Sequence, residues 1–207
     1  NVTVLDRGIE PILAALEESG QADDTIVVFT SDHGDSLGDR GMINKRAFYD
    51  EVARVPLIVH VPWLSDGEQR IGGSIGHTDL VPTLLDLMGQ DVPDHLQGAS
   101  RKEVLTGDAE LVDDVFMQWH GGAATVPLGN AEVERLSEIP WRCMVSGDRW
   151  KLTLSPADTC ELYDLNSDPL ELVNLFDHPD HSDRVRAMTE RMLEWQVSTG
   201  DELDLDL

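Results

Sequence analysis

Basic residues, and lysine above all, are scarce in this sequence, and the shortage excludes one large class of function. Lysine and arginine together number 15 against 40 aspartates and glutamates, which gives a formal net charge of −25. Lysine occurs only at Lys45, Lys102 and Lys151. Because a phosphate backbone is bound by a basic surface, we expect no nucleic acid partner. The acidic residues are spread along the chain, as suits a protein that stays soluble in concentrated salt, so we expect a halophilic source.

Cysteines and long apolar runs are scarce as well. Cys143 and Cys160 are too few for a disulfide framework, and two buried free thiols are favoured over a bridge. No stretch approaches the roughly 18 to 20 apolar residues of a membrane span, so we expect no membrane segment. Residues 1–25 lack the pattern of a signal peptide, and we expect a cytoplasmic location. Because the sequence begins with Asn1 rather than Met, we expect a fragment or a processed product.

Hydrophobic periodicity divides the chain into two parts of different character. Residues 1–107 are predicted to contain a helix, a strand, a loop, a strand and a helix in this order, which is an α/β pattern. The apolar run at 55–62 is typical of a strand that helices bury on both faces. Residues 108–207 are predicted to form a small antiparallel sheet with a closing helix near Gly200. The acidic residues after Gly200 are expected to be a frayed end.

A possible metal site follows the first predicted strand. The strand at 25–30 ends in Ser31-Asp32-His33-Gly34, and ligands of open α/β sheets bind beyond the carboxyl ends of strands. Asp32 and His33 are suitable ligands for one divalent cation, although a cation needs further ligands from elsewhere. The alternative is a capped turn whose histidine bonds to the backbone. Lys45, in the same loop, is a compact charge that suits a tetrahedral anion, or else a solvated surface lysine.

Several stretches in the expected order resemble type I sulfatases of the alkaline phosphatase superfamily. The resemblance rests on FTSDHGDSLGDRGMINKRAFYDEVARVPLIVHVP, HTDLVPTLLDLMG, LQGASRKEVLTG and ELYDLNSDPLELVNL. It implies an α/β fold, the C-terminal half of an alkaline-phosphatase-like sandwich, at residues 1–107. A small antiparallel sheet with a C-terminal helix would follow at residues 108–207. The activity implied is metal-dependent hydrolysis of a sulfate ester substrate.

The resemblance also implies roles for individual residues. Asp32 and His33 would be metal ligands, and the cation would be Ca²⁺, alternatively Mn²⁺ or Mg²⁺. Lys45 would be catalytic and substrate-binding, through the sulfate oxygens or the leaving oxygen. His77 is a further substrate-binding candidate, with a capping or packing role as the alternative.

One part of the family's catalytic site has no counterpart in this sequence. The family nucleophile is a formylglycine made within a C/S-x-P-S/A-R motif, which neither Cys143 nor Cys160 begins. The nucleophile would therefore lie outside this chain, in the N-terminal half of the catalytic domain, which would be its partner, and the isolated chain should be inactive. A phosphodiesterase or phosphonate monoester hydrolase of the same superfamily, and a non-catalytic sulfatase remnant, remain as alternatives.

Overall fold

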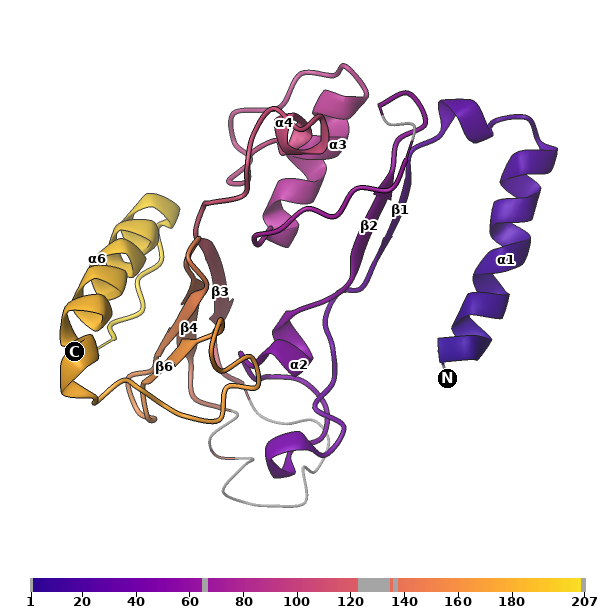
Figure 1. The fold of residues 1–207 in the computed structure, drawn as a ribbon. Coiled ribbons are helices and arrows are strands. Elements are labelled where there is room, and N and C mark those ends of the chain that lie inside the picture. The colour runs from indigo at the N-terminus through magenta and orange to yellow at the C-terminus, as the bar shows by residue number, and fades with distance from the viewer. Residues whose placement is uncertain (1, 65–66, 123–134, 136–137, 206–207) are drawn as a thin grey trace. The chain divides into compact units, whose positions relative to one another are not determined.

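A computed structural model describes residues 2–64, 67–122, 135 and 138–205, and these residues form two compact units (Figure 1). Unit 1 comprises residues 1–32 and 55–70, and unit 2 comprises residues 33–54 and 71–207. The predicted boundary between residues 107 and 108 stays a prediction. The Asp32–His33 peptide bond therefore joins the last residue of one segment of unit 1 to the first residue of unit 2.

Unit 1 consists of a long helix and a two-stranded antiparallel sheet. The sheet pairs Val27 with His60 and Thr30 with Leu57. Its elements are α1 (Val2–Glu18), the 3₁₀ helix η1 (Ala22–Asp24), β1 (Val27–Thr30) and β2 (Leu57–His60). The predicted helix and both predicted strands are thus present, with slightly different ends.

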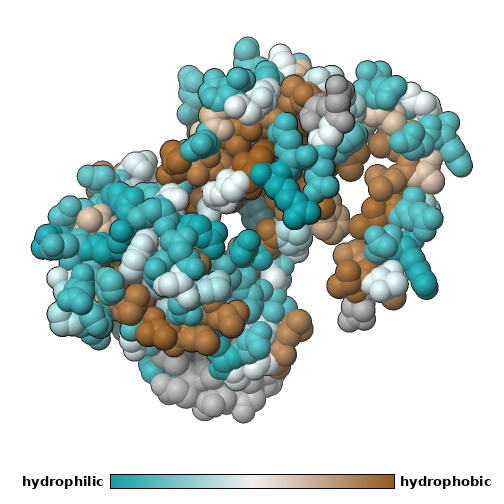
Figure 2. Space-filling view, in the orientation of Figure 1, coloured by the Kyte–Doolittle hydropathy of each residue, from teal (hydrophilic) through white to brown (hydrophobic). Residues whose placement is uncertain are grey.

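The prediction that helices bury the second strand on both faces is wrong for the described residues. Exposed and partly buried residues alternate along β2, and Ile58 is 62% exposed. In a two-stranded sheet such alternation is what the pleat produces, since successive side chains point to opposite faces. Helix α1 likewise buries no residue fully, and apolar side chains lie on its surface (Figure 2).

Unit 2 contains the site loop, which we define as residues 33–54, and a four-stranded sheet. The sheet order is β3-β4-β5-β6, all antiparallel. Its elements are η2 (Asp39–Gly41), α2 (Asp50–Ala53), η3 (His77–Asp79), α3 (Leu80–Leu87), α4 (Lys102–Leu105), β3 (Val115–Trp119), β4 (Trp141–Val145), β5 (Trp150–Leu154), β6 (Glu161–Asp164), η4 (Pro179–His181) and α6 (Ser182–Thr199). Among the described helices of both units, none is long and apolar enough to cross a membrane.

One face of the four-stranded sheet carries the main hydrophobic core. Helix α6 covers this face, and its Met188 and Met192 are fully buried against alternate residues of the strands (Figure 1). The buried members are Met144, Leu152, Leu154, Leu162, Met188, Met192 and Leu205. Full burial of one such side chain contributes about 1.5–3 kcal/mol, which makes this face the stable base of unit 2.

The opposite face of the sheet packs against the site loop. Phe48 and Tyr49 of the loop contact a smaller buried cluster of Val145, Tyr163 and Leu165. The period of two along β4, β5 and β6 therefore sends one set of residues to α6 and the other set to the loop. Cys143 lies in the second set, and burial raises the pKa of its thiol to about 12. Both cysteines are free thiols, Cys143 buried and Cys160 partly so, as predicted.

The prediction of a frayed acidic end is wrong for the described part of that segment. Helix α6 ends at Gly200, which has a φ of +68°, and the chain then turns back toward the sheet. Asp201 accepts bonds from the Nε and Nη2 atoms of Arg142 at 2.5 and 2.7 Å, and Leu205 is buried in the core. Arg142 is only 1% exposed, so the acidic segment supplies the counterion of a buried guanidinium. Residues 206–207 lie outside the described residues.

We expect Asp201→Asn to lower the free energy of unfolding by about 3 kcal/mol, because it leaves a buried arginine without its charged partner. The Arg142 guanidinium and Gln196 hold the pKa of Asp201 well below its usual range. A carboxyl whose pKa is lowered by folding contributes stability above its unfolded pKa of about 4, and this stability is lost as the pH falls below that value. Urea titrations at pH 7 and pH 3 should therefore show a smaller difference between the proteins at pH 3.

The matched control is Asp183→Asn, which breaks an exposed pair with Arg186 on α6. It should change stability by less than about 0.5 kcal/mol. Equal losses in the two variants would contradict the role given to Asp201.

Candidate active site

The Asp-His pair lies directly after β1, as predicted. Ser31 Oγ donates to Asp32 Oδ1 at 3.4 Å. His33 Nδ1 lies 2.7 Å from the carbonyl oxygen of Gly34. Because a carbonyl oxygen only accepts, Nδ1 carries the proton and Nε2 presents a lone pair. Metal-binding histidines are commonly oriented in this way, by a backbone carbonyl at the second ring nitrogen.

Lys45 lies at the same imidazole. Its Nζ contacts His33 Nε2, the atom that the Nδ1 bond leaves as an acceptor. The site loop turns back on itself to make this contact. Ser36 N donates to the carbonyl of Asn44 at 2.9 Å, and Asp35 Oδ1 accepts from the backbone N–H groups of Leu37 and Asn44. Asp35 is therefore a turn residue, and its carboxylate organises the loop that brings Lys45 to His33.

Gly34 is needed for a close approach of two backbone segments. Its N–H donates to the carbonyl of Val52 at 2.8 Å. A Cβ atom at position 34 would lie 1.9 Å from the carbonyl oxygen of Glu51. Gly34 is therefore held against α2, which lies at the C-terminal end of the site loop.

A buried lysine joins the site loop to the sheet. Lys151 of β5 is fully buried, and its Nζ lies 3.0 Å from the Phe48 carbonyl, 2.5 Å from Asp50 Oδ1 and 2.6 Å from Glu171 Oε1. We call Lys151, Asp50 and Glu171 the ion cluster. Burial alone lowers the pKa of Lys151, but the negative groups around it, including Glu171 and Asp50, raise it above its usual value. Burial raises the pKa of Glu171, against the opposing effect of Lys151. The lysine remains an ammonium ion inside the protein.

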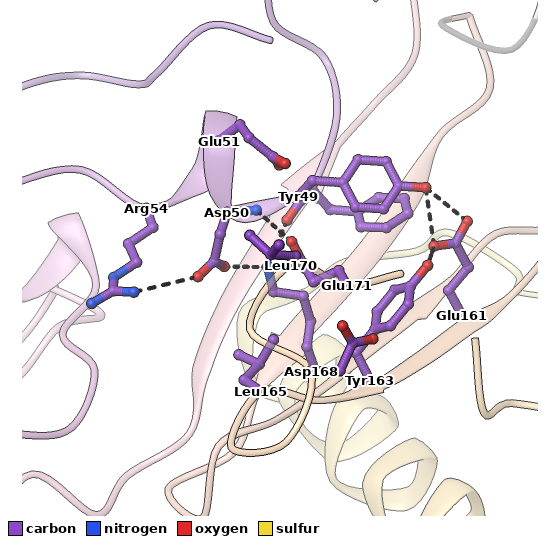
Figure 3. Close-up of polar contacts among 12 residues, drawn as sticks. Tyr49, Asp50, Glu51, Arg54, Glu161, Tyr163, Leu165, Asp168, Leu170 and Glu171 are labelled. Atoms are coloured by element: carbon purple, nitrogen blue, oxygen red, sulfur yellow. Dashed lines mark hydrogen bonds and ion pairs between the residues drawn. The ribbon is translucent and has the colours of Figure 1, made fainter. Parts of the chain in front are cut away.

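A second set of contacts surrounds Tyr49 (Figure 3). Its hydroxyl donates to the Glu161 carboxylate at 3.0 Å, and the hydroxyl of Tyr163 donates to the same group. The Arg40 guanidinium lies 3.7 Å above the Tyr49 ring. Arg40 also donates to the carbonyls of Leu170 and Glu171 at 2.7 and 3.0 Å. Both the middle and the end of the site loop are thus tied to residues 161–171.

The remaining predicted site residue lies on another element. His77 begins η3 and is exposed, and none of its contacts within the described ranges joins it to His33 or Lys45. Its neighbour Asp79 is buried and accepts from Arg101 Nε at 2.8 Å. The substrate-binding role of His77 stays a prediction.

The metal site of Asp32 and His33 stays a prediction as well. In the part of the chain that the structure describes, no group of three or more His, Cys, Asp or Glu side chains could hold a metal ion. The two residues fit a cation chemically, since a carboxylate and an imidazole oriented through Nδ1 are suitable donors.

The ion cluster is a feature that the sequence analysis does not predict. Its one local signal was a lysine within a predicted strand of a chain that has almost no lysine.

Comparison with known protein families shows to which family the chain belongs. Residues 38–198, more than half of the chain, match the family described as N-sulphoglucosamine sulphohydrolase, C-terminal. The chain therefore belongs to this family of sulfatase C-terminal domains, in the alkaline phosphatase superfamily. The fold predicted from the resemblance is confirmed.

Particular relatives agree with the assignment. The choline-sulfatase of Rhizobium meliloti is 32% identical over 182 residues, which cover 86% of this chain and 32% of that protein. A solved structure of BT4656 with its substrate D-glucosamine-2-N,6-O-disulfate is 28% identical, with a TM-score of 0.83, and covers 97% of this chain and 40% of that chain. The phosphonate monoester hydrolase SpPMH from Silicibacter pomeroyi is 28% identical, with a TM-score of 0.78, over 95% of this chain and 39% of that chain. The chain thus spans about a third of the curated relative that it matches.

We expect Gly34→Ala to open the site loop, because the new methyl group cannot fit against the Glu51 carbonyl. The overpacking should lower the free energy of unfolding by about 3 kcal/mol, or move residues 33–36 away from α2. Urea titration measures the first result, and hydrogen exchange of the Gly34 and Ser36 amides measures the second.

The control is Gly72→Ala, at a position where a Cβ meets nothing within 4 Å. It should leave both measurements unchanged. A Gly34→Ala protein with wild-type stability and wild-type exchange would rule out the close packing described.

Proposed function

We propose that this chain is the C-terminal part of a sulfatase and supplies half of the site for metal-dependent hydrolysis of sulfate esters. The observation that carries the proposal is that the site loop brings Lys45 to the His33 imidazole. Because Nε2 has a single lone pair, the ammonium of Lys45 would leave this nitrogen for the oxyanion when a cation is bound there. His33 and Lys45 supply an oriented imidazole and an ammonium group, and Asp32, the preceding residue in the sequence, supplies a carboxylate; these groups suit a cation and an oxyanion. Membership of the sulfatase family supports the same reaction class.

The residues of this chain would bind the cation, orient the substrate and stabilise the negative charge of its sulfate group. Asp32 and His33 would hold a divalent cation, Ca²⁺ or alternatively Mn²⁺ or Mg²⁺. Such a cation supplies Lewis-acid polarisation of the anion when it is bound. Lys45 would place its ammonium charge on the sulfate oxygens or on the leaving oxygen, where negative charge develops. His77 would contact the substrate from η3. The formylglycine nucleophile would come from the N-terminal half of the catalytic domain, the partner of this chain.

A phosphonate monoester hydrolase or phosphodiesterase is the second candidate. The likeness to the phosphonate monoester hydrolase from Silicibacter pomeroyi favours it, since that protein matches at nearly the same identity and coverage as the sulfatase structure. Sulfate and phosphonate esters both present tetrahedral anions, so the charges of Lys45 and a cation suit either. A non-catalytic remnant with the same fold is the third alternative.

The test compares substrates in the longer protein that contains this chain. We expect metal-dependent hydrolysis of p-nitrophenyl sulfate or of a sugar sulfate, with slower turnover of a phosphonate monoester and of a phosphodiester. Fast cleavage of the phosphorus esters, with no turnover of any sulfate ester tried, would contradict the sulfatase proposal. Failure to cleave any of these esters would favour the remnant.

The same assay tests the metal site. Asp32→Ala should abolish bound metal and activity together, because water replaces a hard anionic ligand poorly. Asp23→Ala changes an exposed carboxylate of η1 in the same unit, and should retain metal and activity. Full metal content in the Asp32→Ala protein would refute the assignment of this ligand.

We further propose a halophilic source and a cytoplasmic location. The net charge of −25 supports the first proposal, and two free cysteines support the second. Fractionation of the source cells tests the location.

Salt dependence tests the halophilic proposal. Self-repulsion of the acidic surface is screened over about 10 Å at 0.1 M salt and about 3 Å at 1 M. We expect the melting temperature to rise steadily between 0.1 and 2 M KCl. A melting temperature that is constant or falls over this range would contradict the proposal.

A further inference from the structure

We propose that Lys151, with Glu171 and Asp50, is a positioning device for the active site and sets where Lys45 is held. The inference rests on the proposed function, because it concerns the group that would meet the oxyanion. None of the three residues is placed in contact with substrate. They would act on the reaction through the site loop.

The first argument is that the buried ammonium of Lys151 is surrounded by three acceptor groups, two through hydrogen bonds and one through an ion pair. An ammonium group has three donors and no acceptor. Lys151 has three partners within 3.0 Å, the Phe48 carbonyl, Asp50 Oδ1 and Glu171 Oε1. Two of these partners lie in the site loop, a hundred residues earlier in the chain. The side chain of Lys151 therefore joins the central strand β5 to the site loop.

The second argument is the geometry of Glu171. Its Oε2 accepts from the backbone N–H of Asp50 at 2.8 Å, while its carbonyl accepts from Arg40 at 3.0 Å. Glu171 thus contacts the site loop at two points ten residues apart, and Figure 3 shows it beside Asp50. It does so with a φ of +53°, a conformation that is costly for any residue except glycine. Backbone strain retained at a buried glutamate indicates that its side chain is needed there.

The third argument is the short path from the ion cluster to Lys45. Phe48 and Asp50 are fixed by Lys151, and the Arg46 carbonyl accepts from Trp141 Nε1 at 3.3 Å. The residue next to Lys45 is therefore tied to β4, and residues 48–50 are tied to β5. On its other side, the loop is held by the Ser36–Asn44 hydrogen bond. Lys45 lies between fixed points, and its Nζ is directed to His33.

General stabilisation is a weaker explanation of the ion cluster. Replacing a buried ion pair by apolar residues of similar size is often neutral or stabilising, because desolvation offsets the attraction between the charges. An apolar pair at positions 151 and 171 could hold the sheet together equally well. It could not hold the Phe48 carbonyl, the Asp50 carboxylate and the Asp50 N–H in place.

The first experiment measures hydrogen exchange in this chain. The variant Lys151→Met/Glu171→Leu removes the two fully buried charges together, and the partly exposed Asp50 carboxylate keeps Arg54 as a partner at 3.8 Å. We expect the amides of Gly34, Ser36 and Gly38 to exchange about tenfold faster or more, while the amides of β4 and β5 keep their protection. Lys102→Met is the matched control, since that lysine pairs with Asp86 at a partly exposed place on α4. It should leave the exchange of the site loop unchanged.

The second experiment is a double-mutant cycle on kcat/KM for a sulfate ester in the longer protein. If the ion cluster acts through Lys45, the double replacement should cost about 10²-fold in the wild-type background and far less in a Lys45→Ala background. A purely structural role would give the same cost in both backgrounds. Thermal melting of each variant confirms that it is folded.

Unchanged exchange of the site loop in the folded double variant would overturn the proposal, and so would equal kinetic costs in the two backgrounds. Faster loop exchange together with unequal costs would support it. A failure of the proposed function gives a different result. In that case the wild-type protein would hydrolyse no sulfate ester, while the exchange experiment would still decide whether the ion cluster holds the loop.

Discussion

The ion cluster is the constraint on which the arrangement of unit 2 depends. Lys151 is a fully buried ammonium ion between two carboxylates and a backbone carbonyl. Its burial is tolerable only while opposite charges lie beside it, because an unpaired charge inside a protein costs several kcal/mol. The sheet and the site loop are therefore not independent. If the loop moves away, a buried charge loses two of its three partners.

This constraint explains why the two faces of the four-stranded sheet differ in polarity. The face under α6 is apolar, with methionine and leucine side chains that are fully buried. The face under the site loop carries the ion cluster, the Tyr49–Glu161–Tyr163 contacts and only a small apolar cluster. Apolar packing tolerates small shifts, whereas hydrogen bonds to charged groups fix direction and distance. The stable face supports the sheet, and the polar face determines where the loop lies.

Much of the fold could be predicted from local sequence patterns. The strand at Val115–Trp119, the hairpin around Gly147 and the helix that ends at Gly200 are confirmed, because periodicity and turn residues are local signals. The frayed tail was predicted wrongly for the opposite reason. The pairing of Asp201 with Arg142 spans 59 residues, and no local pattern reports a partner at that distance. Ile58 of the second strand is exposed in this chain, which spans 40% of the solved sulfatase structure that it matches.

The candidate site shows the same limit. Asp32, His33 and Lys45 were identified from a motif, and the structure brings Lys45 to His33. The supporting residues could not be found in this way. Lys151 is separated from Asp50 by 101 residues, so neither spacing nor composition links them. The role of Glu171 depends on one positive φ and one buried carboxylate, which only a three-dimensional structure reveals.

A crystal structure of this chain with Lys151→Met/Glu171→Leu would test the central claim most directly. The account predicts that strands β3 to β6 and α6 keep their wild-type positions, while residues 33–54 shift and the contact between Lys45 and His33 is lost. A site loop that superposes on the wild-type loop, with Lys45 still at His33, would contradict the claim that the ion cluster positions the site.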